Sequence, residues 1–353
     1  TCRAFESIIT SLYIAYLKMK QSDILFSIIV PVYNRIDEVR DLLESLTTQT
    51  DKHFEIILVE DGSSEPCKEI AEEYSQSLNL QYHFKSNEGR SIARNYGIDR
   101  ANGDYFIFVD SDCVLPADYI TELRKALTHN YSDCFGGPDA AHDSFSDIQK
   151  AINYSMTSFL TTGGIRGGKI QLEKFVPRTF NMGFSKEVYA KVGGFREMFS
   201  EDIDMSTRIR LAGFAINLFR NVKVFHKRRV DLKKFWRQVH VFGMSRITLK
   251  LLYPGSMKLV HTLPALFVIF ASMMIIGTIW QWWSVIPLIV YLFAVWIFGI
   301  ISTKSLKIGS LSVITSIIQL AGYGTGFIRA YTWKILLRHG RDEAEEIEMR
   351  RGK

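Results

Sequence analysis

The chain has 353 residues, a formal net charge of +6 and 23% charged residues. This length favours about two domains, each able to bury a core of its own. The basic excess gathers just before a long apolar region, at Lys223, Lys227, Arg228, Arg229, Lys233, Lys234 and Arg237. A basic cluster in this position favours an anionic lipid surface over a nucleic acid. The charge pattern therefore favours a membrane-associated protein, and no nucleic acid is expected among its partners.

Residues 24–109 alternate between apolar runs and segments with helical spacing. Runs at 24–32, 53–60 and 105–109 are typical of strands buried in a parallel sheet. Helices are predicted at 37–46, 66–78 and 91–101, and a short strand at 81–84. This alternation predicts an α/β sheet with right-handed crossovers. Ligands of such sheets lie beyond the carboxyl ends of the strands. The polar residues found there are Tyr33, Asn34, Glu60, Asp61, Asp110 and Asp112.

The pattern is less regular from 135 to 226. A helix is predicted at 201–212, followed by strand material at 215–225. The segment from Gly163 to Lys169 has the glycine and lysine spacing of a P-loop. However, Ile170 stands where that motif needs a magnesium-binding hydroxyl. We therefore interpret this segment as a loop.

Three apolar spans follow, at 259–280, 282–302 and 308–328, and each has about the length of a transmembrane helix. Buried core helices are the alternative, which the near absence of charge in three successive spans disfavours. The basic cluster predicts a multi-pass protein of the cell inner (plasma) membrane with its α/β domain in the cytoplasm. Three spans then put the basic tail outside, against the positive-inside rule. A re-entrant or interfacial third segment, containing Gly322, Gly324 and Gly326, is therefore an alternative.

The predicted organisation has five parts. Residues 1–22 are an N-terminal extension with an apolar stretch too short to cross a bilayer, and no function is assigned to them. The remaining parts are an α/β domain (23–230), an amphipathic interfacial segment (231–258), a membrane region (259–333) and a charged tail (334–353). The interfacial segment is inferred from Phe235, Trp236 and Phe242 among lysines.

Two carboxylates, Asp110 and Asp112, stand one residue apart directly after a predicted buried strand. Like charges this close repel each other, and a bound cation relieves the repulsion. Hard divalent cations such as Mg²⁺ and Mn²⁺ take carboxylate and phosphate oxygens as ligands. The pair therefore indicates a metal site that can also neutralise a diphosphate. Taken alone, such a pair is more often a solvated turn or a helix cap.

The surrounding motifs resemble those of family 2 glycosyltransferases, in the same order along the chain. The resemblance covers residues 24–230. Its motifs are the opening strand Ser27–Asn34, the turn Val59–Ser64, the segments Asn87–Arg90, Ala93–Gly97 and Ala101–Asp104, the metal motif Phe108–Asp112, and the later segments Val192–Phe195 and Ser200–Asp204. Processive members carry Gln-x-x-Arg-Trp, whereas Gln238 here is followed by Val239-His240-Val241-Phe242. This difference favours transfer of one sugar per encounter.

The resemblance implies a GT-A fold, with two abutting Rossmann-like halves on one mixed sheet, and an inverting displacement. It implies a nucleotide-sugar donor, with a uridine diphosphate sugar as the expectation, and Mn²⁺ or Mg²⁺ as cofactor. The donor-binding residues that it implies are Pro31, Tyr33, Asn34, Asp61, Asn87, Gly89, Arg94 and Asp110. The metal ligands that it implies are Asp112, Asp110 and His226, although a surface histidine is the alternative for His226. The acceptor-binding residues that it implies are Asn181, Gly183 and Glu201.

Asp202 is the predicted catalytic base. An acceptor hydroxyl loses its proton as it attacks the anomeric carbon, and a positioned carboxylate can take that proton. Acidic residues are also favoured in the first turn of a helix, so the residue type alone does not decide; the resemblance assigns this role to Asp202.

The expected function is transfer of one sugar to a lipid-linked or other saccharide acceptor at the membrane surface, in cell-surface polysaccharide or glycan assembly. One alternative is a polyprenyl-phosphate glycosyltransferase, whose phosphate nucleophile needs no strong base. An alternative of another class is a non-catalytic nucleotide-sugar-binding scaffold. Dependence of transfer on Asp202 separates the first two, whereas donor binding without turnover on any acceptor would support the scaffold.

Overall fold

The computed structural model describes residues 23–140, 146–162, 175–226 and 231–338. These residues form two compact units, each described by itself. The sheet unit comprises 23–140 and 175–226, and the helical unit comprises 146–162 and 231–338. The segment 146–162 lies inside the predicted 23–230 domain, yet its contacts group it with the C-terminal helices. The rejected P-loop segment lies outside the described residues.

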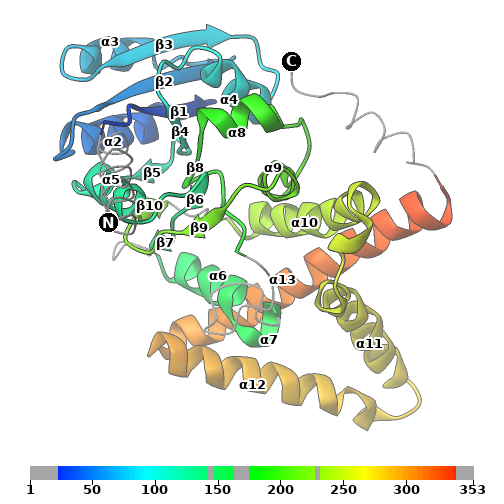
Figure 1. The fold of residues 1–353 in the computed structure, drawn as a ribbon. Helices are drawn as coiled ribbons and strands as arrows, with labels where there is room; N and C mark the ends of the chain where they lie inside the picture. The colour runs from blue at the N-terminus through cyan, green and yellow to red at the C-terminus, as the bar shows by residue number, and fades with distance from the viewer. Residues whose placement is uncertain (1–22, 141–145, 163–174, 227–230, 339–353) are drawn as a thin grey trace, which may run out of the picture. The chain divides into compact units, whose positions relative to one another are not determined.

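The sheet unit contains a seven-stranded mixed sheet with the order β3-β2-β1-β4-β8-β6-β9 (Figure 1). The strands β3, β2, β1 and β4 are parallel, β8 is antiparallel to both of its neighbours, and β9 is parallel to β6. Their bounds are β1 (Phe26–Val32), β2 (Phe54–Asp61), β3 (Leu80–Lys85), β4 (Tyr105–Phe108), β6 (Cys134–Gly136), β8 (Met182–Ser185) and β9 (Ile216–Leu218). The predicted α/β class with a mixed sheet is confirmed.

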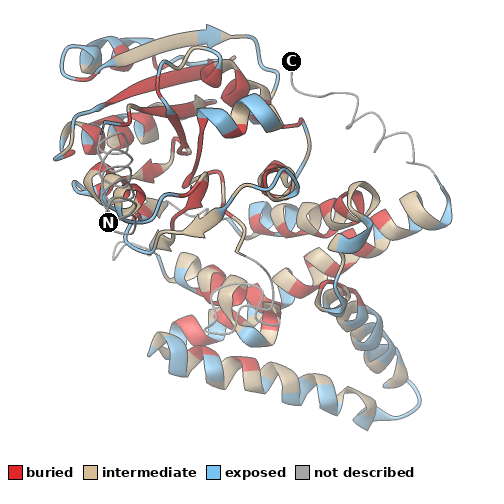
Figure 2. Ribbon diagram, in the orientation of Figure 1, coloured by how far each residue is buried: buried red, intermediate tan, exposed pale blue. Residues whose placement is uncertain are grey.

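Both faces of this sheet are buried, which explains the unbroken apolar runs in the sequence. Alternate residues of β1 enter two different cores: Ile28 and Val30 enter one, and Ile29 enters the other. The first core is completed by α2 (Ile36–Thr47), α3 (Lys68–Ser75) and α5 (Tyr119–His129). The second core is completed by α4 (Arg90–Ile98), α8 (Lys186–Val192) and α9 (Glu201–Leu211). Figure 2 shows the central strands as buried.

A second, three-stranded sheet has the order β5-β10-β7, with β5 at Cys113–Val114, β7 at Asp139–Ala140 and β10 at Val224–His226. The sequence predicted continuous strand material at 215–225. The structure instead divides it between two sheets, because the Val222 N–H donates to the Phe219 carbonyl (3.1 Å) and closes a turn between β9 and β10. This division places His226 opposite Cys113, the residue after Asp112.

The helical unit is built around α13 (Leu306–Tyr331), which packs mainly against four long helices of the described residues. These are α6 (Asp147–Thr157), α10 (Leu232–Leu252), α11 (Leu263–Gly277) and α12 (Ile286–Thr303). The short elements are α7 (Phe159–Thr162), the 3₁₀ turns η1 (Pro254–Ser256), η2 (Leu259–Thr262) and η3 (Trp282–Val285), and the π-helical turn η4 (Thr332–Leu336). Phe235 of α10 is buried in a cluster with Ile152 and Val239, so it contacts protein rather than the lipid interface that we predicted for this segment.

In the part of the chain that the structure describes, three helices are long and apolar enough to cross a membrane: Leu259–Gly277, Trp282–Thr303 and Leu306–Leu336. They correspond to the three predicted spans, and they indicate membrane association. The third continues eight residues past the predicted end at 328 and runs without a break through the glycines that suggested a re-entrant segment. At about 1.5 Å per residue, the 26 residues of α13 exceed the roughly 30 Å of a hydrocarbon core. The helix has no break at these glycines, and the number of spans stays a prediction.

Gly183 lies at the centre of the large sheet, in register with Ile107 of β4 and Phe135 of β6. A Cβ atom at this position would lie 2.4 Å from Phe135 Cε1 and 2.8 Å from the Phe106 carbonyl oxygen. Both contacts are closer than van der Waals packing allows. Packing therefore explains this glycine, which the resemblance had assigned to acceptor binding.

The substitution Gly183→Ala is expected to destabilise the sheet unit by about 1–3 kcal/mol, the usual cost of overpacking a core. Thermal or denaturant unfolding of the detergent-solubilised protein measures this loss. Gly255→Ala is the control, because a Cβ at Gly255 meets no atom within 4 Å. Equal stability of the two variants would contradict the packing explanation.

Candidate active site

The site is assembled at the carboxyl ends of the parallel strands of the sheet unit. The strand β1 ends at Val32, β2 at Asp61 and β4 at Phe108. Because Val32 pairs with Glu60 and Ile29 pairs with Phe108, the residues that follow these strands share one edge of the sheet. Polar residues far apart in the sequence meet there, as the strand-end rule predicts.

Asn34 connects the loops after β1 and β2. Its backbone has a φ of 53°, in the left-handed region that asparagine tolerates better than most residues. Its backbone N–H donates to Ser63 Oγ at 2.7 Å, and its Oδ1 accepts from the Ser64 N–H at 2.9 Å. The adjacent Tyr33 is 52% exposed, and Pro31 is half-buried. Asn34 therefore ties the loops after β1 and β2 together beside the exposed Tyr33 ring.

Asp61 organises the loop between β3 and α4. Lys85 Nζ donates to its Oδ1 at 2.8 Å. The backbone N–H groups of Glu88 and Gly89 donate to its two carboxylate oxygens at 3.0 and 2.8 Å. Asn87 lies in the same loop, so three predicted donor residues, Asp61, Asn87 and Gly89, lie together. The carboxylate keeps lone pairs for a further donor, such as a ribose hydroxyl.

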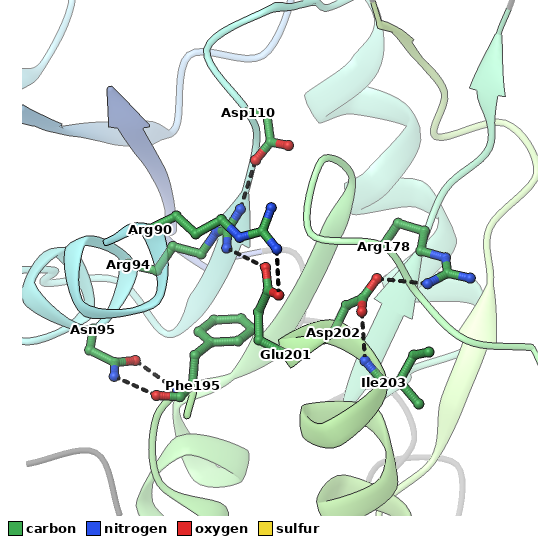
Figure 3. Close-up of polar contacts among 9 residues, drawn as sticks. All are labelled: Arg90, Arg94, Asn95, Asp110, Arg178, Phe195, Glu201, Asp202 and Ile203. Atoms are coloured by element: carbon green, nitrogen blue, oxygen red, sulfur yellow. Dashed lines mark hydrogen bonds and ion pairs between the residues drawn. The ribbon is translucent and has the colours of Figure 1, made fainter. Parts of the chain in front are cut away.

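Four charged side chains form a continuous chain beside this loop (Figure 3). Arg94, only 1% exposed, donates from Nη2 to Asp110 Oδ1 at 2.8 Å and from Nη1 to Glu201 Oε1 at 3.1 Å. The other oxygen of Glu201 accepts from Arg90 Nη2 at 2.9 Å. Glu201 is itself almost fully buried. Arg94 and Glu201 therefore act on other protein groups in this structure.

Asp110 and Asp112 follow β4, as predicted, and both face arginines. Asp110 pairs with Arg94, and Arg35 Nη1 lies 3.9 Å from Asp112 Oδ2. Among the described residues, no three His, Cys, Asp or Glu side chains are close enough to hold a metal by themselves. Two carboxylates nevertheless fit Mg²⁺ or Mn²⁺, because such ions bind through one or two carboxylates and complete their shell with phosphate oxygens and water. The backbone of His226 lies opposite Cys113; its side chain is outside the described part of the chain.

Asp202 lies in the first turn of α9, two residues after Ser200, whose φ is 65°. Its Oδ2 accepts from Arg178 Nη1 at 2.8 Å, and its Oδ1 accepts from the Ile203 N–H at 2.8 Å (Figure 3). Burial raises the pKa of this carboxyl, but the charge and hydrogen bond of Arg178, with the Ile203 N–H, more than offset burial and hold the pKa below its usual range. The carboxylate is therefore ionised at neutral pH.

Asn181, a predicted acceptor residue, is fully buried in the sheet unit. Its Oδ1 accepts from the Tyr119 hydroxyl at 2.7 Å, and its Nδ2 donates to the Val222 carbonyl at 2.8 Å. Both polar atoms of the side chain are used within the protein. The structure therefore brings neither Asn181 nor Gly183 to the surface of the site, whereas Glu201 lies next to Asp202.

The arginines that contact the carboxylates, Arg35, Arg90 and Arg178, were not among the predicted site residues. Arg90 was visible inside the Asn87–Arg90 motif and lies one helical turn before Arg94. Arg178 gave no local signal, because its partner Asp202 is 24 residues away. It is placed by a turn in which the Asn181 N–H donates to the Arg178 carbonyl.

Comparison with known proteins shows which families and structures this chain resembles. The family model described as glycosyl transferase family 2 matches residues 27–193. Glycosyltransferase GlyA of Streptococcus pneumoniae is 40% identical over 108 residues, 30% of this chain and 16% of that protein. Glycosyltransferase AglE of Haloferax volcanii is 26% identical over 248 residues, 64% of this chain and 76% of that protein. An uncharacterized glycosyltransferase of Rickettsia felis is 39% identical over 104 residues, 30% of this chain and 17% of that protein.

Among solved structures, the mannosyltransferase PcManGT from Pyrobaculum calidifontis, in complex with GDP-Man and Mn²⁺, has a TM-score of 0.52 at 14% identity. The match covers 90% of this chain and 88% of that one. At this identity, the likeness concerns the fold alone, and it agrees with the predicted GT-A arrangement. The chain spans less than a fifth of the length of the first curated relatives that it matches.

Proposed function

Since the chain carries a glycosyltransferase family 2 domain, we propose that it transfers one sugar, with inversion, from a nucleotide-diphosphate-sugar donor to a lipid-linked saccharide. The observation that carries this proposal is the grouping of Asp110, Arg94, Glu201 and Asp202 at the strand ends of the sheet unit. A metal-motif carboxylate and an ionised candidate base belong to one polar cluster (Figure 3). The three apolar helices, which indicate membrane association, support a lipid-linked acceptor.

The donor half of the proposed site consists of the strand-end loops. Tyr33 offers an exposed aromatic face for a nucleobase, and Asp61 offers carboxylate oxygens to the base or ribose. Asp110 and Asp112, with His226 as a further candidate, would hold Mn²⁺ or Mg²⁺. When bound, the ion offsets charge on the departing diphosphate. A uridine diphosphate sugar remains the expected donor.

The chemical step assigned to this chain is proton removal. The acceptor hydroxyl oxygen forms a bond to the anomeric carbon as the bond from that carbon to the diphosphate oxygen breaks. Asp202 takes the hydroxyl proton, which its ionised state allows. Arg94 is too buried to serve as an open phosphate ligand, so we assign it the task of orienting Asp110. Arg178 holds Asp202 in place and keeps it charged.

Replacing Asp202 by Asn is expected to lower the transfer rate by about 10²-fold or more, the usual range for loss of a general base. Binding of Mn²⁺ and nucleotide is expected to stay within about two-fold of wild type, since the donor residues are untouched. Single-turnover transfer and nucleotide titration measure the two effects, with the exposed Asp118→Asn as control.

Undiminished transfer by the Asp202→Asn variant would contradict the base assignment and favour a phosphate nucleophile, as in polyprenyl-phosphate glycosyltransferases. Donor binding by the wild-type protein, without turnover on any saccharide or polyprenyl-phosphate acceptor, would favour the non-catalytic scaffold instead.

Replacing Arg178 by Gln is expected to raise the pKa of Asp202, because the charge that lowers it is removed while burial remains. The base then becomes protonated at a higher pH. The acidic limb of the kcat/KM profile is expected to move up by about one to two pH units. Arg178→Lys keeps a positive charge and is expected to move the limb less. An unchanged acidic limb in Arg178→Gln would contradict the pairing of Arg178 with the base.

A further inference from the structure

The chain of charges Arg90–Glu201–Arg94–Asp110 joins two segments with different tasks in the proposed reaction. Asp110 belongs to the metal motif after β4, and Glu201 is the first residue of α9, directly before Asp202. Arg94 bridges them with separate nitrogens at 2.8 and 3.1 Å. The buried guanidinium of Arg94 is therefore shared between Asp110, on the donor side of the proposed site, and Glu201, beside the proposed base.

Burial and a contact with Phe195 hold the guanidinium group of Arg94 in place. Arg94 is 1% exposed, and its guanidinium carbon lies 5.7 Å from the centre of the Phe195 ring. One residue along α4, the Asn95 side chain exchanges two hydrogen bonds with the Phe195 backbone, at 2.7 and 2.8 Å. Because Arg94 and Glu201 are both shielded from water, their interaction is weakly screened, whereas Asp110 is 33% exposed and stays open to a metal ion. A change at one carboxylate therefore alters the interaction with the other.

From this geometry we propose that Glu201 is a positioning residue that couples metal binding at Asp110 to the placement of Asp202, through Arg94. This inference rests on the proposed function and extends it. A cation at Asp110 competes with Arg94 for that carboxylate, so Arg94 interacts more fully with Glu201. Glu201 then holds the start of α9, and with it Asp202, more firmly. Metal and donor binding thereby prepare the base for the acceptor.

Thermodynamic linkage makes this coupling reciprocal. If metal binding strengthens the contact between Arg94 and Glu201, then loss of the Glu201 charge weakens metal binding. Without that charge, Arg94 has only Asp110 as a charged partner and competes more strongly with the cation. Glu201 is therefore expected to control metal affinity although it lies outside the metal site. A Glu201 that only bound the acceptor or supported the fold would not have this effect.

The test uses Mn²⁺ alone as the probe, titrated into the full-length protein in detergent and followed by the paramagnetic resonance of free Mn²⁺. Glu201→Gln is expected to weaken Mn²⁺ binding about five-fold or more, the lower end of typical couplings. Asp202→Asn removes a neighbouring charge that does not belong to the row of ion pairs from Arg90 to Asp110. This variant is expected to change the Mn²⁺ affinity by less than about two-fold. Glu187→Gln, an exposed carboxylate of α8, controls for general charge effects.

The path through Arg94 is tested by a double-mutant cycle with Arg94→Lys, whose single ammonium group cannot reproduce the two-pronged bridge. The Glu201→Gln effect is expected to shrink in that background. If Glu201→Gln fails to fold, Glu201→Asp is titrated instead: it keeps the charge but is too short to bridge both arginines, and an intermediate weakening is expected.

Mn²⁺ affinity equal to wild type in the folded Glu201 variant, an equal loss in Asp202→Asn, or strict additivity in the cycle would overturn the coupling alone. Absence of Mn²⁺ binding by the wild-type protein would instead contradict the metal site of the proposed function.

Discussion

The candidate site depends on the two ion pairs of Arg94, whose guanidinium group is buried. Removing a charge from water costs several kcal/mol unless it is paired in good geometry. Arg94 meets this requirement with two carboxylates, Asp110 and Glu201, which belong to segments 91 residues apart in the sequence. Loss of one partner leaves an incompletely compensated buried charge, at a cost of about 3–5 kcal/mol for typical pairs. The buried guanidinium of Arg94 therefore keeps Asp110 and Glu201 together.

Sheet topology explains why these groups can meet at all. The strands β1, β2 and β4 are parallel, so the loops that follow them lie at one edge of the sheet. The strand β8 pairs antiparallel with β4. Helices α4 and α9 pack on the same face of the sheet, so Arg94 and Glu201 approach each other from that face. The site thus combines strand-end loops, which hold Asp61 and Asp110, with helix starts, which hold Arg90 and Asp202.

Much of this arrangement could be predicted from local sequence. Strands buried on both faces leave long apolar runs, so β1, β2 and β4 were predicted nearly to their ends, and the motifs after them located Asp61, Asp110 and Asp112. The predicted helix at 201–212 agrees with α9. These features depend on neighbouring residues, whose pattern is visible in a single sequence.

What escaped prediction depends on contacts between distant residues. The division of 215–225 between two sheets follows from pairing with β6, β5 and β7. The internal use of Asn181 depends on Tyr119 and Val222, and the need for glycine at 183 depends on Phe135. The pairing of Arg178 with Asp202 likewise has no local signature. A resemblance can assign roles to such positions, but only the folded geometry separates side chains that face the site from those that support it.

The central claim, that this chain uses a nucleotide sugar together with a divalent cation, is tested most directly by ligand-induced thermal stabilisation of the full-length protein in detergent. A series of nucleotide-diphosphate sugars is screened with and without Mn²⁺, alongside Asp112→Asn. At 100 times its Kd, a bound donor adds about 2.7 kcal/mol of stability. The account predicts such stabilisation by at least one nucleotide sugar, only with Mn²⁺ and only with Asp112 intact. Lack of stabilisation by every nucleotide sugar, or stabilisation independent of both Mn²⁺ and Asp112, would contradict it.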